Sequence, residues 1–272
     1  MTDAPSPITS LQNDQVKALV RLRTRRERDR EQLMLIEEPL VIARALAADH
    51  PMTKLYYCPE MIAAADQQLL LSVQAQTDQA VEVNAPVMAK ISYRDQSAGL
   101  LVVAPQQRAH LEQLPKKSDS PALYVVLEGV EKPGNLGAVL RVADGAGADA
   151  VIVCGQGTDV FNPNVLRASR GANFTMPTVQ CSHEQLWAFL AERKICALAT
   201  SPTAADNWDQ ADLSQAVAIF LGTEHDGLSD EMLGNAAFKV SIPMAGAGDS
   251  LNVATTAAIL LFEAVRQRRT SV

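Results

Sequence analysis

The sequence predicts an α/β fold whose C-terminal part is a mostly parallel sheet flanked by helices. Three observations lead to this prediction. Short apolar runs alternate with segments of helical periodicity along the chain. The apolar runs of the C-terminal half are almost continuous, which is typical of parallel strands covered on both faces. The chain has 272 residues, which is enough for two domains that each bury a core.

The composition favours a reduced, cytoplasmic protein. Hydrophobic residues make up 47% and charged residues 20% of the chain, and no apolar run reaches the ~18 residues that span a membrane. The opening segment MTDAPSPITS lacks the basic and apolar regions of a secretory signal. The four cysteines are far apart and the four histidines lack metal-ligand spacing, so we expect buried thiols and no metal.

Residues 1–104 are expected to form a small α/β/α domain. We expect strands over 33–36, 55–58, 81–83 and 100–104, and helices over 10–33, 40–48, 61–74 and 86–91. Residues 105–121 are polar with little periodic apolar content, which indicates a linker. Residues 122–272 then form the second domain. Its expected strands are 123–127, 150–153, 178–180, 196–199, 217–221 and 238–242, and its expected helices are 136–146, 163–172, 184–193, 230–236 and 251–268.

The first expected helix carries a basic cluster on an otherwise acidic chain. The formal net charge is −7, yet residues 17–30 contain seven basic and two acidic residues. Such a patch can bind a specific polyanion, and an arginine-rich helix suits RNA phosphates. The candidate RNA-binding residues are Arg21, Arg23, Arg25 and Arg26. A charged helix that is merely solvated is the alternative.

Three glycine-containing strand-to-loop segments carry candidate chemistry in the second domain. The first, PGNLGAVLRVADGAGADAVIV, places Asn135 at the mouth of a helix and Arg141 six residues later. A strand, a glycine turn and a helix also begin a dinucleotide-binding fold, but Gly134 and Gly137 give G-x-x-G rather than G-x-G-x-x-G. The plain alternative is a turn and a helix with a solvated Arg141.

The second segment, FLGTEHDGLSDE, runs from a buried strand into Gly222, Glu224 and Gly227. Ser229 or Asp230 can cap the helix that follows. Glu224 stands where a strand has ended and a ligand can be met, although a surface carboxylate is the ordinary alternative.

The third segment, SIPMAGAGDSLNVATTAAILL, is the most informative. A loop with Gly246 and Gly248 precedes the polar trio Ser250-Leu251-Asn252, which opens a long apolar helix. Glycines admit close approach and a helix N-terminus exposes unpaired N–H groups, so this loop is suited to hold a polar ligand against backbone. Ser250 is the candidate N-cap.

These segments stand in the order of three motifs of one enzyme family. The motifs read N-x-G-x-x-x-R-x-A over 135–143, G-x-E-x-x-G-L over 222–228, and I-P-M-x-G followed by S-L-N-V over 242–253. Over residues 121–269 the chain resembles the SpoU (TrmH-like) family of RNA ribose methyltransferases, within the SPOUT superfamily. The stretch 159–177, with Asn162-Pro163 and Arg167-Ala168-Ser169, is similar to the family as well.

The resemblance implies a fold, a cofactor and an assembly. The C-terminal segment would be threaded through a preceding loop in a deep trefoil knot, a rare exception to unknotted chains. S-adenosylmethionine would lie bent between the loops 200–202, 222–227 and 242–251, read by backbone N–H and C=O groups. The cofactor-binding residues so implied are Thr200, Ser201, Gly222, Gly227, Ile242, Met244 and Leu251. Family members act as homodimers, with the site near the dimer interface.

The resemblance also implies methyl transfer to a ribose 2′-hydroxyl of rRNA or tRNA. Arg141 would anchor the target phosphate and stabilise negative charge on the oxygen, because a guanidinium does not readily lose its proton. The ribose and Arg141 would be oriented by Asn135, Glu224, Ser250 and Asn252. Further RNA contacts are expected from Arg167 and Arg170.

The N-terminal half suits the small ribosomal-protein-like RNA-binding domain that many members of this family carry. They commonly show Glu-Gly after the first strand, where this chain has Glu37-Glu38-Pro39. Two other functions stay open. A catalytically silent RNA-binding homologue would transfer no methyl group to RNA. A nicotinamide-dependent oxidoreductase would be stabilised against heat by NAD rather than by S-adenosylmethionine.

Overall fold

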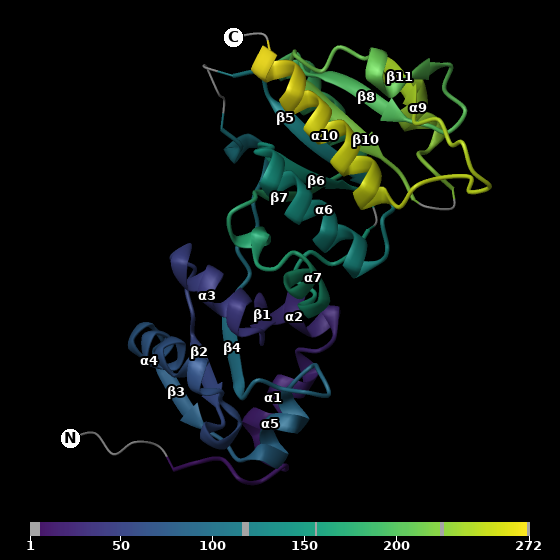
Figure 1. The fold of residues 1–272 in the computed structure, drawn as a ribbon. Helices are drawn as coiled ribbons and strands as arrows, with labels where there is room; N and C mark the ends of the chain where they lie inside the picture. Colours follow the sequence, from purple (N-terminus) through teal and green to yellow (C-terminus); the bar gives the residue numbers. More distant parts are fainter. Residues whose placement is uncertain (1–5, 116–119, 156, 224–225, 271–272) are drawn as a thin grey trace. The chain divides into compact units, whose positions relative to one another are not determined.

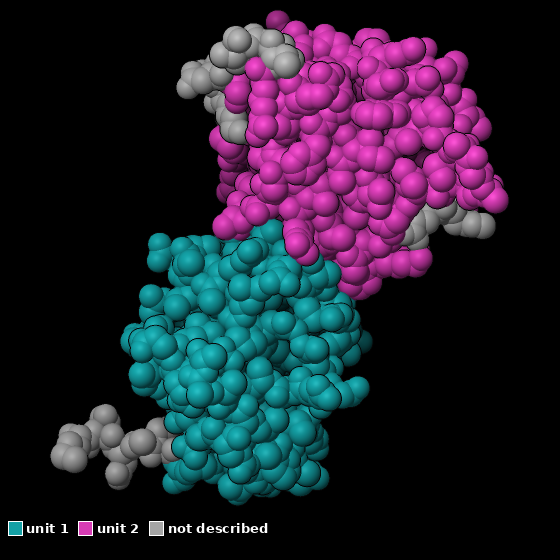
Figure 2. Space-filling model, viewed as in Figure 1, with its two compact units in different colours: residues 1–107, 161–174 teal, residues 108–160, 175–272 magenta. Residues whose placement is uncertain are grey.

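The computed structural model describes residues 6–115, 120–155, 157–223 and 226–270, and the chain divides into two compact units (Figure 2). Unit 1 contains Met1–Gln107 and Phe161–Phe174, and unit 2 contains Arg108–Val160 and Thr175–Val272. Each unit has its own hydrophobic core. Among the described helices, none is long and apolar enough to cross a membrane.

Unit 1 is built on a four-stranded sheet in the order β1-β4-β2-β3. Its strands are β1 (Leu33–Ile36), β2 (Lys54–Tyr57), β3 (Gln79–Glu82) and β4 (Leu100–Pro105). Its helices are α1 (Asp14–Arg21), α2 (Arg25–Glu31), α3 (Pro39–Ala47), α4 (Gln67–Gln76), α5 (Ala85–Ile91) and α7 (Pro163–Ala168). Strand β4 is antiparallel to β1 and β2, whereas β2 and β3 are parallel. The four expected strands are confirmed.

Helices α1 and α5 cover one face of this sheet. Val16 and Leu19 of α1 and Met88 of α5 pack in one cluster with Leu35 and Leu101 of the strands. Side chains alternate along a strand, so the neighbouring strand residues face the other side of the sheet. Two short 3₁₀ turns precede α4, which begins six residues later than the sequence predicts.

The single helix expected over 10–33 is wrong, because the chain forms α1 and α2 with a break between them. The break is stabilised by Arg28, whose side chain is buried in α2. Its guanidinium donates to the carbonyl oxygens of Leu22 at 2.8 Å and Arg23 at 2.7 Å. Carbonyls at a helix end lack partners within the helix, so a buried cation that binds them ends α1 there.

Unit 2 is built on a seven-stranded sheet in which each described pair of neighbours is parallel. The strand order is β7-β6-β5-β10-β8-β11-β9. The strands are β5 (Leu123–Glu128), β6 (Ala150–Cys154), β7 (Thr178–Cys181), β8 (Cys196–Thr200), β9 (Asp206–Asn207), β10 (Val217–Leu221) and β11 (Phe238–Ser241). The helices are α6 (Pro133–Ala146), α8 (His183–Arg193), α9 (Asp230–Asn235) and α10 (Val253–Thr270). The predicted parallel sheet with flanking helices is confirmed.

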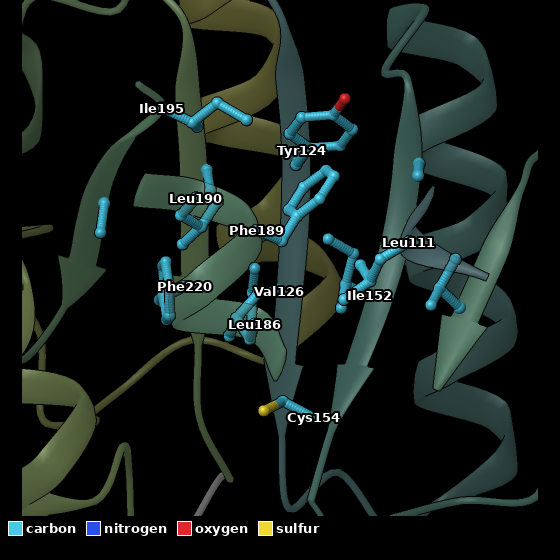
Figure 3. Packing of buried hydrophobic residues seen from close by; sticks show 14 of the residues in the cluster. Leu111, Tyr124, Val126, Ile152, Cys154, Leu186, Phe189, Leu190, Ile195 and Phe220 are labelled. Carbon is cyan, nitrogen blue, oxygen red and sulfur yellow. The ribbon is translucent and has the colours of Figure 1, made fainter. Parts of the chain in front are cut away.

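Helices cover both faces of this sheet. On one face, α6 and α10 pack against each other, and α10 also contacts β10 (Figure 1). On the other face, side chains of α8 pack onto β5, β6 and β10 (Figure 3). There Phe189 meets Tyr124 edge to face with ring centroids 5.6 Å apart, and Trp187 stacks on Phe220 at 5.3 Å.

The segment expected as a linker contributes to the core of unit 2. Leu111 and Leu114 are buried in that core, and Ala109 forms a β-bridge with Val179 of β7. One 3₁₀ turn over Leu111–Gln113 carries this packing. A single turn is too short to show a helical repeat of apolar residues. The sequence pattern therefore does not indicate that these two leucines, which stand among polar residues, are buried.

The buried position of Phe220 yields a stability prediction. Phe220 is 0% exposed, whereas Phe238 on β11 is 59% exposed. We expect Phe220→Ala to lower the free energy of unfolding by about 3–5 kcal/mol, because it leaves a cavity between the sheet and α8. The matched change Phe238→Ala should cost less than about 1 kcal/mol. Urea unfolding followed by circular dichroism measures both, and equal losses would contradict the described core.

Candidate active site

Four neighbouring strands of unit 2 end at the same edge of the sheet. Strands β5, β10, β8 and β11 are adjacent and parallel, so their carboxyl ends lie together. Successive strands after β5 extend outward through β6 to β7, whereas β10 lies on the other side of β5. Ligands of open α/β sheets bind at the carboxyl ends of the strands where the strand order reverses in this way. The expected ligand loops follow β8, β10 and β11 and therefore meet at this edge.

The loop after β10 folds back on itself. The N–H of Thr223 donates to the carbonyl of Gly227 at 3.0 Å, and the N–H of Gly227 donates to the carbonyl of Thr223 at 3.2 Å. A Cβ at Gly222 would lie 2.1 Å from the carbonyl carbon and oxygen of Gly227. Gly227 itself has a φ of +71°, so this turn requires glycine at both positions. Glu224, expected to be catalytic, lies outside the described residues.

The end of β8 is tied to both of its neighbours. The hydroxyl of Thr200 donates to the carbonyl of Phe220 in β10 at 3.0 Å. The N–H of Ser201 donates to the carbonyl of Val240 in β11, also at 3.0 Å. These two expected cofactor-binding residues are half-buried and join the strands that carry the other two loops.

The loop between β11 and α10 is open to solvent over residues 243–250, and Met244 is 38% exposed. Ile242 and Leu251, at its two ends, are half-buried. Helix α10 is capped by Asn252, whose Oδ1 accepts from the N–H of Ala254 at 3.0 Å. The expectation that Ser250 is the N-cap is therefore wrong. Asn is as good a cap as Ser, and only the observed start of α10 at Val253 decides between them.

Two expected site residues from distant segments touch. The Nδ2 of Asn252 donates to the Oδ1 of Asn135 at 3.1 Å, which joins the start of α10 to the first turn of α6. Arg141 lies further along α6, displaced by about 9 Å along the axis and about 120° around it from Asn135. Its side chain is exposed and makes no hydrogen bond or ion pair with the residues that the structure describes. The side chains of the two asparagines therefore hydrogen-bond to each other, and the side chain of Arg141 does not join them.

A charged network that the sequence did not reveal lies beside the loop after β10. Glu128, the last residue of β5, accepts hydrogen bonds from the N–H and the hydroxyl of Ser229, both at 2.8 Å. Its Oε1 also lies 3.1 Å from Nε2 of His183, whose Nδ1 lies 3.1 Å from Glu231. Ser229, one of the two cap candidates that the sequence offers, caps α9 through the N–H of Met232. The network depends on β5 and β10 being neighbours, which the sequence does not state.

The arginines expected to contact RNA differ in their surroundings. Arg23 donates to the carbonyl of Lys90 at 2.5 Å and to that of Ser92, so its guanidinium joins the break between α1 and α2 to the end of α5. Arg21, Arg25 and Arg26 have exposed side chains. The cluster therefore contains both structural and surface arginines.

Arg167 and Arg170 are exposed residues of the segment around α7, which packs on β1 within unit 1. A shallow, solvent-open hollow lies beside Arg167, and Glu37, Tyr93 and Arg94 also line it. Burial raises the pKa of Glu37, and the N–H group of Tyr93 that donates to its carboxyl opposes this shift. Among the described residues, no group of three or more acidic, histidine or cysteine side chains is arranged to hold a metal ion.

A parallel sheet with a switch point between β5 and β10, and glycine loops at that edge, places this chain among the open α/β proteins, whose ligands bind at the carboxyl ends of the strands. The profile of the SpoU rRNA Methylase family matches residues 122–262, and that of the MRM3-like substrate binding domain matches residues 13–102. The chain belongs to the SpoU rRNA methylase family.

Individual relatives extend this result. The 23S rRNA (guanosine-2′-O-)-methyltransferase RlmB of Pseudomonas putida is 37% identical over 160 residues, covering 58% of this chain. The chain spans 64% of that relative's length. A crystal structure of an RNA 2′-O ribose methyltransferase gives a TM-score of 0.83 at 39% identity, covering 97% of this chain and 100% of that one. AviRb from Streptomyces viridochromogenes, in complex with the cofactor AdoMet, gives 0.87 at 26% identity, with coverages of 95% and 99%.

The closed turn after β10 yields a second prediction. We expect Gly222→Ala to open this turn, because its Cβ would collide with Gly227 at 2.1 Å. Gly246→Ala, in the loop after β11, is the control because a Cβ there meets nothing within 4 Å. Hydrogen exchange at the Gly227 amide should speed up by at least about tenfold in the first variant only. An unchanged rate in Gly222→Ala would show that the turn tolerates a side chain.

Proposed function

We propose that this chain is an S-adenosylmethionine-dependent methyltransferase that modifies a ribose 2′-hydroxyl of RNA in the cytoplasm. The observation that carries the proposal is the convergence of three motif segments at the carboxyl edge of one parallel sheet, with Asn135 and Asn252 in contact. Membership of the SpoU rRNA methylase family supports it. The relative from Pseudomonas putida is named for 23S rRNA, which favours rRNA over tRNA as the substrate.

The residues at this edge fit S-adenosylmethionine. Gly222 lets the loop after β10 close without a side chain, so a ligand there would meet backbone. The cofactor would be held by Thr200, Ser201, Gly222, Gly227, Ile242, Met244 and Leu251. S-adenosylmethionine supplies an electrophilic methyl group on a sulfonium. The structure of AviRb in complex with the cofactor AdoMet supports the same assignment for this chain.

The side chains of this chain would position and activate the ribose hydroxyl. The exposed guanidinium of Arg141 suits a phosphate oxygen and a developing alkoxide, since it offers fixed donors and keeps its charge. Asn135 and Asn252, whose side-chain Oδ1 and Nδ2 atoms are 3.1 Å apart, would orient the ribose. Ser250 and Glu224 complete the proposed catalytic set. Orientation of this kind supplies about 7 kcal/mol or more of a barrier.

A homodimer and a knotted chain are part of the proposal. Phe262 on α10 is 51% exposed, whereas the other described apolar residues of this helix are buried or half-buried, and such an exposed large apolar side chain favours a contact with a second copy. The last helix, α10, packs against α6 and β10, which come earlier in the chain. The resemblance to the family implies in addition that this C-terminal segment is threaded through a preceding loop.

Unit 1 would hold the RNA substrate. Most of it matches the MRM3-like substrate binding domain. Its exposed arginines are suited to bind RNA phosphates, because a guanidinium group can donate two parallel hydrogen bonds to one phosphate group. The proposed contacts are Arg21, Arg25, Arg26, Arg167 and Arg170. The guanidinium of Arg23 binds backbone carbonyls, so Arg23 would attract RNA through its positive charge rather than by direct contact.

The role of Arg141 can be tested directly. We expect Arg141→Ala to reduce transfer of tritiated methyl to RNA by at least about a hundredfold, because the developing alkoxide loses its cationic partner. The affinity for S-adenosylmethionine should stay unchanged by calorimetry. Arg269→Ala, another exposed arginine, is the control. Substantial turnover in Arg141→Ala would refute the assignment, and no transfer by the natural sequence would favour the silent RNA-binding homologue.

The exposed arginines of α2 give a separate prediction. The double change Arg25→Ala and Arg26→Ala should weaken RNA binding and lower the slope of log affinity against log salt by about 0.7 per lost phosphate contact. Arg28→Ala should instead lower the melting temperature, since Arg28 is 1% exposed and binds the end of α1. Filter binding over a salt series measures the slope. An unchanged slope would indicate that α2 is a solvated helix.

A further inference from the structure

Glu128 is a nearly buried carboxylate beside the proposed cofactor loop. It is the last residue of β5, which pairs with β10 up to Leu127 and Leu221. The loop 222–228 leaves β10 at the next residue. The side chain of Glu128 is 12% exposed. A carboxylate in such a position loses hydration, so it is stable only when donors replace the water.

Two donors of Ser229 and one ring nitrogen of His183 surround this carboxylate. One oxygen accepts from the N–H of Ser229 at 2.8 Å. The other accepts from the hydroxyl of Ser229 at 2.8 Å and lies 3.1 Å from Nε2 of His183. His183 is held on its far side by Glu231, 3.1 Å from Nδ1. The network thus runs from α8 and α9 to a single carboxylate at the end of β5.

The position of Ser229 makes this network relevant to the loop. Ser229 directly follows Leu228, so Glu128 fixes the point at which the loop returns to the fold. The residue after Glu128 contacts the other end of the loop. Gly129 has a φ of +67°, and a Cβ there would lie 2.8 Å from Cγ2 of Thr223. Glu128 therefore binds Ser229, which follows the turn between Thr223 and Gly227, and Gly129 lies against Thr223 at the start of that turn.

We propose that Glu128 is a positioning residue that holds the two described ends of the loop after β10, Thr223 and Gly227–Leu228, in the paired arrangement that binds the methyl donor. This inference rests on the proposed function. Glu128 itself touches neither the reacting atoms nor the RNA, and acts through Ser229 on the backbone of Gly227 and Leu228. His183 and Glu231 hold its carboxylate in place. Loss of Glu128 therefore weakens cofactor binding and leaves the machinery around Arg141 intact.

A set of four variants tests this role. Glu128→Ala raises the dissociation constant and the KM for S-adenosylmethionine about tenfold, because a buried carboxylate with several donors is lost. The kcat at saturating cofactor and the affinity for RNA change by less than about twofold. Glu128→Gln gives a smaller rise, since its amide oxygen still accepts from Ser229. Glu184→Gln, an exposed carboxylate on the same helix as His183, is the matched control and leaves all values unchanged.

Glu128→Asp provides the conservative comparison. Its carboxylate is shorter by one methylene but keeps its charge, so it restores part of the cofactor affinity that Glu128→Ala loses. An unchanged dissociation constant in Glu128→Ala overturns the proposal. Equal losses of cofactor affinity, RNA affinity and kcat also overturn it, because they indicate a general loss of structure. If Glu128→Ala fails to fold, Glu128→Gln and Glu128→Asp decide the outcome alone.

Hydrogen exchange without any ligand separates this inference from the proposed function. In Glu128→Ala, or in Glu128→Gln if the alanine variant does not fold, the amides of Gly227 and Ser229 exchange at least about fivefold faster, whereas amides of β10 keep their rates. If the natural chain binds no S-adenosylmethionine, the proposed function fails, and faster exchange in the variants still supports Glu128 as the residue that closes the loop. Unchanged exchange at Gly227 and Ser229 refutes it whatever the cofactor.

Discussion

The parallel alignment of β5, β10, β8 and β11 is the constraint on which the proposed site depends. Neighbouring parallel strands end at one edge, so residues that are distant in sequence meet there. Asn135 and Asn252 are 117 positions apart, and Glu128 and Ser229 are 101 apart, yet both pairs form hydrogen bonds. The buried side chains of α8 against β10 hold this alignment, because Phe220 cannot leave its stack with Trp187 without opening the core. Packing on one side of the sheet therefore determines where the loops begin.

The site at this edge relies on backbone shape more than on charge. Gly222 and Gly227 are required by the turn itself, and the loop 243–250 presents exposed chain rather than a charged cluster. Arg141 is the exception, and it lies away from the asparagine pair on α6. A net charge of −7 is compatible with an RNA enzyme on this arrangement, because the cations that would contact phosphate are few and local. In the proposed function, electrostatic recognition of RNA and binding of the cofactor would then belong to different elements.

Much of this arrangement could be predicted from the sequence, and the failures have physical causes. Six of the seven strands of unit 2 were predictable because near-continuous apolar runs are typical of buried parallel strands, whereas the two polar residues of β9 carry no such signal. The break before α2 was not, because it depends on burial of Arg28, a residue type that is ordinarily exposed. The cap at Asn252 could not be distinguished from one at Ser250, since both residues cap well. The network around Glu128 requires the strand order, which no local pattern contains.

The arginines of unit 1 show why a count of charges overstates a binding surface. Residues 17–30 contain seven basic side chains, but Arg23 and Arg28 bind backbone carbonyls and serve the fold. Unit 1 also contains the exposed Arg167 and Arg170, in addition to the exposed arginines of α2. These two residues come from a segment within the stretch that matches the methylase profile. Two distant parts of the sequence thus build one unit. The stretch 161–174 connects covalently to unit 2 at both ends while packing on β1, so the surface proposed to hold RNA is tied by the chain itself to the domain proposed to modify it.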